Sequence, residues 1–265
     1  MTARRPTRPP GLLVDTAWLG DLVGARRLAP VDLRDRDDYL AGHIPGAVHL
    51  DLEDLGSSRD GCDNVLISPV DFERTMARLG ISNQDTVVAY DDHWGLPSAR
   101  LVWSLHYHGH PSAVVLNGGW DLWNEEGRVV SDVPPPKKAG AFEVRLNPDV
   151  HADFEWISEI IARDEVVLLD TRSETEFDAG HLPGARSWDW FKAVPEGSWV
   201  TSRDPEALRS EWAELGVRPS DEIVAYCRSG MRAAHTYVVL RHAGFTRVRV
   251  FDGSWQEWSM RMGDA

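Results

Sequence analysis

The chain has few cysteines, no long apolar run and a shortage of positive charge, and each shortage argues against a class of protein. Cys62 and Cys227 are the only cysteines among 265 residues. Two thiols are too few for a disulfide framework in a chain of this length, and a lone reactive thiol is typical of a reducing compartment. No stretch approaches the roughly 18 uninterrupted apolar residues of a membrane span. We therefore expect a cytoplasmic protein that crosses no membrane.

The charge balance bears on the partners of the protein. The chain has 28 Lys and Arg residues against 42 Asp and Glu residues, which gives a formal net charge of -14. Such a charge repels the phosphate backbone of nucleic acids and anionic lipid at long range. We expect neither nucleic acid nor a membrane as a partner, and an anionic substrate would need a locally positive pocket.

Comparison of the chain with itself reveals a duplication. Three blocks of sequence return in the same order, at offsets of 138, 136 and 135 residues. Constant order and near-constant spacing indicate two copies of one unit. The blocks are 41–47 with 179–185, 87–90 with 223–226, and 117–120 with 252–255.

The boundary between the copies falls at three successive prolines, Pro134–Pro136, because proline removes backbone donors and favours extended geometry. We expect a disordered tail over 1–11, a first domain over 12–130, a linker over 131–147 and a second domain over 148–265. Within each copy, short apolar runs alternate with amphipathic stretches. This alternation is typical of an α/β fold, with a mainly parallel sheet flanked by helices.

The second copy has a thiol at the place where such sheets bind ligands, the carboxyl end of a strand. Cys227 directly follows a strand expected over 222–226 and precedes a helix expected over 233–242. The helix dipole and the side chains of Arg228 and Arg232 would stabilise negative charge on the sulfur. Since the thiolate is the form that attacks, we predict that Cys227 is a catalytic nucleophile.

The first copy lacks this chemistry. Asp91 stands in the corresponding place, and its loop is one residue longer and carries two extra carboxylates. We expect this loop to repel an anion, and we predict that the first copy is inactive.

The length of the Cys227 loop separates two cysteine chemistries. Cysteine-dependent phosphatases use a seven-position loop that ends in arginine and wraps a tetrahedral phosphate. Here arginine comes one position early, at Arg232, and Ala233 stands last. The tighter loop favours a sulfur atom carried on the cysteine. A phosphatase or arsenate reductase and a non-catalytic sulfur-carrier module remain the alternatives from other classes.

These features together resemble the tandem-domain rhodanese family of thiosulfate and 3-mercaptopyruvate sulfurtransferases. The resemblance rests on the repeated Gly-His-(Ile/Leu)-Pro-Gly-Ala block, on Cys227–Arg232 and on Gly253–Trp255, and it covers the chain from about residue 12 to 262. It implies two rhodanese-like domains, of which the second transfers sulfane sulfur from thiosulfate to cyanide, thioredoxin or another thiol through a persulfide. It implies no cofactor and no metal.

The resemblance also assigns residues to the site and leaves the donor open. Family members usually place a substrate-binding arginine four residues after Arg172, where this chain has Glu176, and Asn64 falls near the place of a histidine of the mercaptopyruvate enzymes. The loop arginines favour a dianionic donor such as thiosulfate, and 3-mercaptopyruvate is the alternative. The expected donor-binding residues are Arg228, Ser229, Gly230, Met231 and Arg232, and the expected pocket-lining residues are Trp94, Trp190 and Phe191.

Other residues that invite a role have simpler explanations. Cys62 lies in the polar segment 57–63, which we expect to be a loop without catalytic function. His43 and His181 recur in both copies, including the copy without the thiol, so we expect them to stabilise turns.

Overall fold

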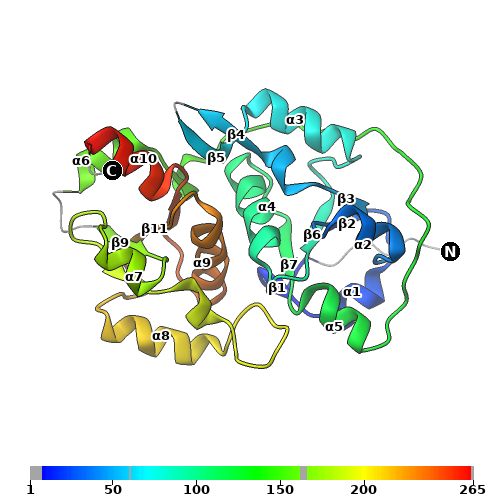
Figure 1. Cartoon of the computed structure of the whole chain (residues 1–265). Helices are drawn as coiled ribbons and strands as arrows, with labels where there is room; N and C mark the ends of the chain where they lie inside the picture. The colour runs from blue at the N-terminus through cyan, green and yellow to red at the C-terminus, as the bar shows by residue number, and fades with distance from the viewer. Residues whose placement is uncertain (1–7, 60, 162–165, 264–265) are drawn as a thin grey trace.

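The computed structural model describes residues 8–59, 61–161 and 166–263 and shows two α/β domains lying side by side (Figure 1). Most of the tail that we expected over 1–11 lies outside the described residues. No helix of the described residues is long and apolar enough to span a membrane.

The first domain is built on a five-stranded sheet in which every neighbouring pair is parallel, in the order β1-β7-β6-β2-β3. Helices follow the strands, as the alternating sequence pattern predicted. The strands are β1 (Leu13–Val14), β2 (Leu28–Asp32), β3 (Val48–His49), β6 (Thr86–Tyr90) and β7 (Ala113–Leu116). The helices are α1 (Thr16–Leu22), α2 (Arg36–Ala41), α3 (Pro69–Arg78), α4 (Leu96–Tyr107), α5 (Gly119–Glu125) and the 3-10 helix η1 (Leu52–Leu55).

The second domain repeats this sheet, in the order β8-β12-β11-β9-β10 and again with parallel pairs only. The prediction of two mainly parallel sheets flanked by helices is therefore confirmed. The strands are β8 (His151–Ala152), β9 (Val166–Asp170), β10 (Arg186–Ser187), β11 (Glu222–Tyr226) and β12 (Val248–Phe251). The helices are α6 (Phe154–Ile160), α7 (Glu174–Asp178), α8 (Pro205–Glu214), α9 (Met231–His242), α10 (Ser254–Met262), η2 (Pro148–Val150) and η3 (Trp190–Ala193).

An antiparallel hairpin, β4 (Gly56–Arg59) with β5 (Cys62–Leu66), extends from the first domain to the second. At its end, the Leu66 N–H donates a 2.8 Å hydrogen bond to the carboxylate of Asp252 in the second domain. The hairpin corrects one expectation, because Cys62 does not lie in a polar loop. Cys62 begins β5, and its side chain is buried.

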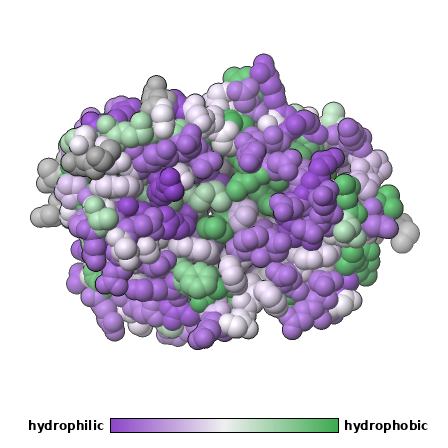
Figure 2. Space-filling model, viewed as in Figure 1, coloured by the Kyte–Doolittle hydropathy of each residue, from purple (hydrophilic) through white to green (hydrophobic). Residues whose placement is uncertain are grey.

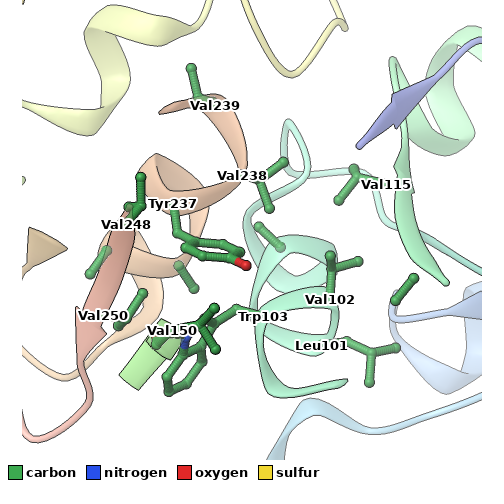
Figure 3. Close-up of a cluster of buried hydrophobic side chains, with 14 of the residues drawn as sticks. Leu101, Val102, Trp103, Val115, Val150, Tyr237, Val238, Val239, Val248 and Val250 are labelled. Atoms are coloured by element: carbon green, nitrogen blue, oxygen red, sulfur yellow. Dashed lines mark hydrogen bonds between the residues drawn. The ribbon is translucent and has the colours of Figure 1, made fainter. Parts of the chain in front are cut away.

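The two domains share one apolar core, centred on the packing of α4 against α9. Figure 3 shows Tyr237 and Val238 of α9 in the same cluster as Val102 and Trp103 of α4. These four side chains are at most 1% exposed, and each fully buried apolar side chain contributes roughly 1.5–3 kcal/mol to folding. The two copies are therefore held as one body, with the helix that follows each central strand facing its counterpart.

The segment that joins the domains, over 132–147, has no helix or strand and runs along the first domain. The Gly140 N–H donates to the carbonyl of Ala77 at 3.0 Å. A Cβ atom at Gly140 would lie 2.2 Å from the carbonyl oxygen of Ile81. The segment therefore approaches the first domain so closely that only glycine fits at this point.

Candidate active site

Cys227 lies at the junction between the central strand β11 and the helix α9. Its N–H donates to the hydroxyl of Ser254 at 3.2 Å, and its carbonyl accepts a 3.0 Å hydrogen bond from the Trp255 N–H. Gly230 precedes α9 with a φ of 86°, a left-handed conformation that favours glycine. This turn lets α9 begin at Met231, two residues earlier than we expected. The thiol is therefore placed beside the positive end of a 12-residue helix.

Ser254 forms a hydrogen bond to the backbone of Cys227, and its own backbone has an unusual conformation. Its φ is 54° and it is fully buried, whereas the first domain has Gly119 at the corresponding place with the same φ. The Ser254 hydroxyl donates to the carbonyl of Phe251 at 2.7 Å and accepts from the Cys227 N–H. A left-handed conformation of a non-glycine residue costs on the order of 1 kcal/mol. The two hydrogen bonds offset this strain and fix the residue that carries the thiol.

Arg232 lies beside the sulfur and is paired with Glu176. Two guanidinium nitrogens of Arg232 lie 2.6 and 2.8 Å from the two carboxylate oxygens of Glu176 in α7. Burial works to lower the pKa of Arg232, but hydrogen bonds to Glu176 and the neighbouring Cys227 outweigh it and raise the pKa above its usual value. The hydrogen bond from Arg232 lowers the pKa of Glu176 to about 2. The cation that we expected to bind the donor is thus neutralised by a carboxylate.

The other loop residues differ in accessibility. Arg228 is exposed and, among the described residues, has no ion-pair partner. Its carbonyl accepts a 3.1 Å hydrogen bond from the Gln256 N–H, so its backbone is fixed while its side chain is free. Ser229 and Met231 are half-buried, and Gly230 is buried. The loop therefore presents one exposed cation and one paired cation.

The loop of the first domain shows what this turn can bind. The carboxylate of Asp91 accepts hydrogen bonds from the N–H groups of His93, Gly95 and Ser98 at 2.7, 2.9 and 2.9 Å. Burial raises the pKa of Asp91, while these hydrogen bonds and one from the Ser98 hydroxyl oppose the rise. We expected this loop to repel an anion. The ring of N–H groups is already filled by the Asp91 carboxylate, and the repulsion of a further anion stays a prediction.

The predicted aromatic residues come together at the contact between the domains. The rings of Trp94 and Phe191 lie 5.5 Å apart, edge to face, and Trp190 contacts His235 at 4.9 Å. His235 Nε2 lies 3.2 Å from the carbonyl oxygen of Trp94, and burial lowers the pKa of His235 to about 4. Figure 2 shows apolar side chains gathered near the middle of this face, between the two domains. Among the described residues, no hydrogen bond joins the three predicted rings to the Cys227 loop.

Sequence analysis missed an ion pair beneath the loop. Arg100 of α4 lies 2.7 Å from Asp252, and both side chains are buried. Arg100 also donates to the carbonyl of Asn64 at 2.6 Å, which is the role of Asn64 in this structure. A Cβ atom at Gly230 would lie 2.6 Å from Arg100 Nη1. The first domain therefore places a cation directly against the Cys227 loop.

The residues that we assigned to turns make the same contacts in both copies. His43 Nδ1 lies 2.8 Å from the carbonyl oxygen of Tyr39, and His181 Nδ1 lies 2.9 Å from that of Phe177. Each imidazole also stacks on the ring of the same residue. These contacts are independent of the thiol.

The structure also has a groove that lies away from Cys227. A groove of about 1040 Å³ runs between the ends of α4 and α9 and the segment 8–12, and none of the predicted site residues lines it. Within the described residues, no group of three or more His, Cys, Asp or Glu side chains is arranged to hold a metal ion.

Known proteins match this arrangement along most of the chain. The rhodanese-like domain model matches residues 15–126 and again 153–261. The sulfur carrier protein TtuD of Thermus thermophilus is 34% identical, over 96% of this chain and 95% of that protein. A thiosulfate sulfurtransferase of Corynebacterium glutamicum is also 34% identical, over 94% of this chain and 88% of that protein.

A solved structure matches the fold over most of the chain. The structure of SseA from Escherichia coli, a 3-mercaptopyruvate sulfotransferase, superposes with a TM-score of 0.83 at 25% identity, over 92% of this chain and 99% of that chain. Both domains are included at this coverage. The chain belongs to the family of rhodanese-like domain proteins, with two copies of the domain in tandem.

Proposed function

We propose that this protein is a sulfurtransferase that takes the outer sulfur of thiosulfate onto Cys227 and passes it to cyanide or a thiol. In the first step the Cys227 thiolate attacks the outer sulfur, the S–S bond of thiosulfate breaks, and sulfite leaves with the bonding electrons. In the second step the acceptor attacks the outer sulfur of the Cys227 persulfide and the Cys227 thiolate leaves. With cyanide the product is thiocyanate. Atoms and charge balance without an external oxidant or reductant.

The observation that carries the proposal is the position that Asp91 and Cys227 share, directly after a central strand and before the helix that follows it. The Asp91 loop binds a carboxylate through backbone N–H groups, and Cys227 occupies the corresponding position before α9. The thiolate and the persulfide anion are the charged forms that the positive end of α9 stabilises. Two related proteins that are named for sulfur transfer or sulfur carriage agree with this reading.

Particular observations bear on three alternatives. SseA favours 3-mercaptopyruvate as a donor, and TtuD favours a sulfur carrier that hands its sulfur to another protein. A phosphatase is disfavoured because Ala233, at the position where that loop needs arginine, is fully buried within α9. A tetrahedral phosphate would find no charged side chain there.

The substrate experiment compares initial rates with thiosulfate and with 3-mercaptopyruvate, each with cyanide as acceptor, for wild type and Cys227→Ser. We expect thiosulfate turnover in the wild type and a loss of at least about a thousandfold in the variant, because a serine hydroxyl is a far weaker nucleophile than a thiolate. Turnover with 3-mercaptopyruvate and none with thiosulfate would identify 3-mercaptopyruvate as the donor instead. Equal rates in the two proteins would remove the enzyme assignment.

The proposal extends to the setting of the reaction. We propose a cytoplasmic location and a thiol such as thioredoxin as an acceptor, with neither nucleic acid nor a membrane as partner. The two cysteines and the net charge of -14 support this setting. Reduced thioredoxin should remove the sulfur from the Cys227 persulfide, which the mass of the protein before and after mixing would reveal.

A further inference from the structure

The Glu176–Arg232 pair stands directly beside the reacting sulfur. Its hydrogen bonds of 2.6 and 2.8 Å use both oxygens of the carboxylate and two nitrogens of the guanidinium. The side chains are 22% exposed for Arg232 and 36% for Glu176, so the pair is partly shielded from solvent. A donor that delivers sulfur to Cys227 therefore meets a neutral pair instead of a free cation.

Glu176 is held in this position from its own helix as well. The Ser173 N–H and hydroxyl both donate to Glu176 Oε2, at 3.2 and 3.1 Å, and the Glu176 N–H donates to the Ser173 hydroxyl. These contacts form a capping box at the start of α7. Swinging Glu176 away from Arg232 would break this cap, so an incoming anion must compete with a carboxylate that is fixed in place.

The charge of the donor decides how large this effect is. Thiosulfate brings two negative charges close to its sulfur. A persulfide of a zwitterionic thiol, such as cysteine persulfide, has a net charge of at most −1. Repulsion by the Glu176 carboxylate grows with the charge of the donor, and so does the attraction that Arg232 would exert if it were unpaired. Arg228 is exposed and more strongly screened by solvent and salt.

We propose that Glu176 is a specificity-determining residue, which occupies Arg232 and thereby weakens the use of dianionic sulfur donors relative to organic persulfides. This inference rests on the proposed sulfurtransferase function and names the donor class that the site favours. The step with a persulfide also balances. The Cys227 thiolate attacks the outer sulfur of R–S–SH, the S–S bond breaks, the proton stays on the transferred sulfur, and the thiolate R–S⁻ leaves.

The test uses Glu176→Gln, which removes the charge and keeps the shape. Glutamine at this position preserves a capping box, so the variant should fold as the wild type does. We expect kcat/KM for thiosulfate to rise about tenfold, because Arg232 becomes available to the dianion and a like charge is removed. For cysteine persulfide we expect a change of less than about threefold, since fewer charges interact.

Glu174→Gln is the matched control. Glu174 lies in the same helix and is exposed, and among the described residues it has no ion-pair partner, so its removal changes the net charge equally but leaves Arg232 paired. We expect Glu174→Gln to change kcat/KM for neither donor by more than about twofold.

Three results would overturn the inference. An unchanged or lower kcat/KM for thiosulfate in Glu176→Gln would contradict it, and so would an equal rise for both donors or an equal rise in Glu174→Gln. Such results leave the proposed function intact as long as the wild type transfers sulfur. A wild-type protein that takes sulfur from neither donor would instead overturn the proposed function, and this inference with it.

Discussion

Arg100 and Asp252 form a buried ion pair across the two domains, with Arg100 Nη2 2.7 Å from Asp252 Oδ1. Arg100 belongs to the helix that follows the Asp91 loop, and Asp252 follows the last strand of the second domain. The same guanidinium lies against Gly230 of the Cys227 loop. The first domain, which has Asp91 at the place of Cys227, is therefore part of the structure that supports the Cys227 thiol.

Breaking this pair should destabilise the whole protein. Asp252→Asn would leave the charge of Arg100 uncompensated in the interior, which costs about 3–5 kcal/mol. Urea unfolding followed by tryptophan fluorescence measures this change. Arg145→Gln is the control, because Arg145 pairs with Glu143 on the exposed surface and should cost less than about 1 kcal/mol. Equal losses of unfolding free energy in the two variants would show that the buried pair contributes no more to stability than the exposed one.

Removing the carboxylate of Asp91 should affect stability and leave the chemistry in place. Asp91→Ala leaves buried N–H groups of the first loop without an acceptor, and we expect a loss of about 1–3 kcal/mol in unfolding free energy. Turnover per folded molecule should stay within about twofold, since Asp91 has no contact with Cys227. The neighbouring Asp92→Ala should cost much less, because its side chain lies outside the ring of N–H groups. A loss of turnover without a loss of stability would contradict this account.

Three buried histidines predict a characteristic sensitivity to acid. Burial lowers the pKa of His106, His108 and His235 from 6.5 to about 4. Between these values the unfolded chain binds protons that the folded protein does not bind, so stability is present above pH 6.5 and is lost as the pH falls toward 4. Each histidine contributes at most about 3 kcal/mol to this loss.

Urea unfolding at pH 7.5, 6 and 5 measures the slope. His235→Asn should flatten this slope relative to the wild type, because it removes one of six histidines whose pKa burial lowers. A wild-type stability that is the same at pH 7.5 and 5 would contradict the assignment of these histidines as neutral and buried.

Local sequence patterns were sufficient to predict the frame of the site. A run of four apolar residues ending at Tyr226, then a cysteine, a glycine and a largely apolar stretch, predict a strand, a turn and a helix, and the structure has β11 and α9 in these places. The duplication predicted two similar sheets, because each copy repeats the same alternation of strand and helix signals. All of this information lies within short windows of the chain.

The contacts that set the charge of the site could not be predicted in the same way. Arg100 and Asp252 come from different copies, and Glu176 and Arg232 are 56 residues apart in the sequence and meet only in the folded chain. Cys62 was misjudged for a similar reason. Its neighbours in sequence are polar, but tertiary packing of the hairpin β4–β5 buries its side chain.

The mass of the intact protein after incubation with thiosulfate, and again after cyanide, tests the central claim most directly. The account predicts a gain of one sulfur atom in the wild type and in Cys62→Ser, lost on addition of cyanide, and no gain in Cys227→Ser. The two thiols of the chain thus serve as site and control. A wild-type protein that gains no sulfur, or a gain that persists in Cys227→Ser, would contradict it.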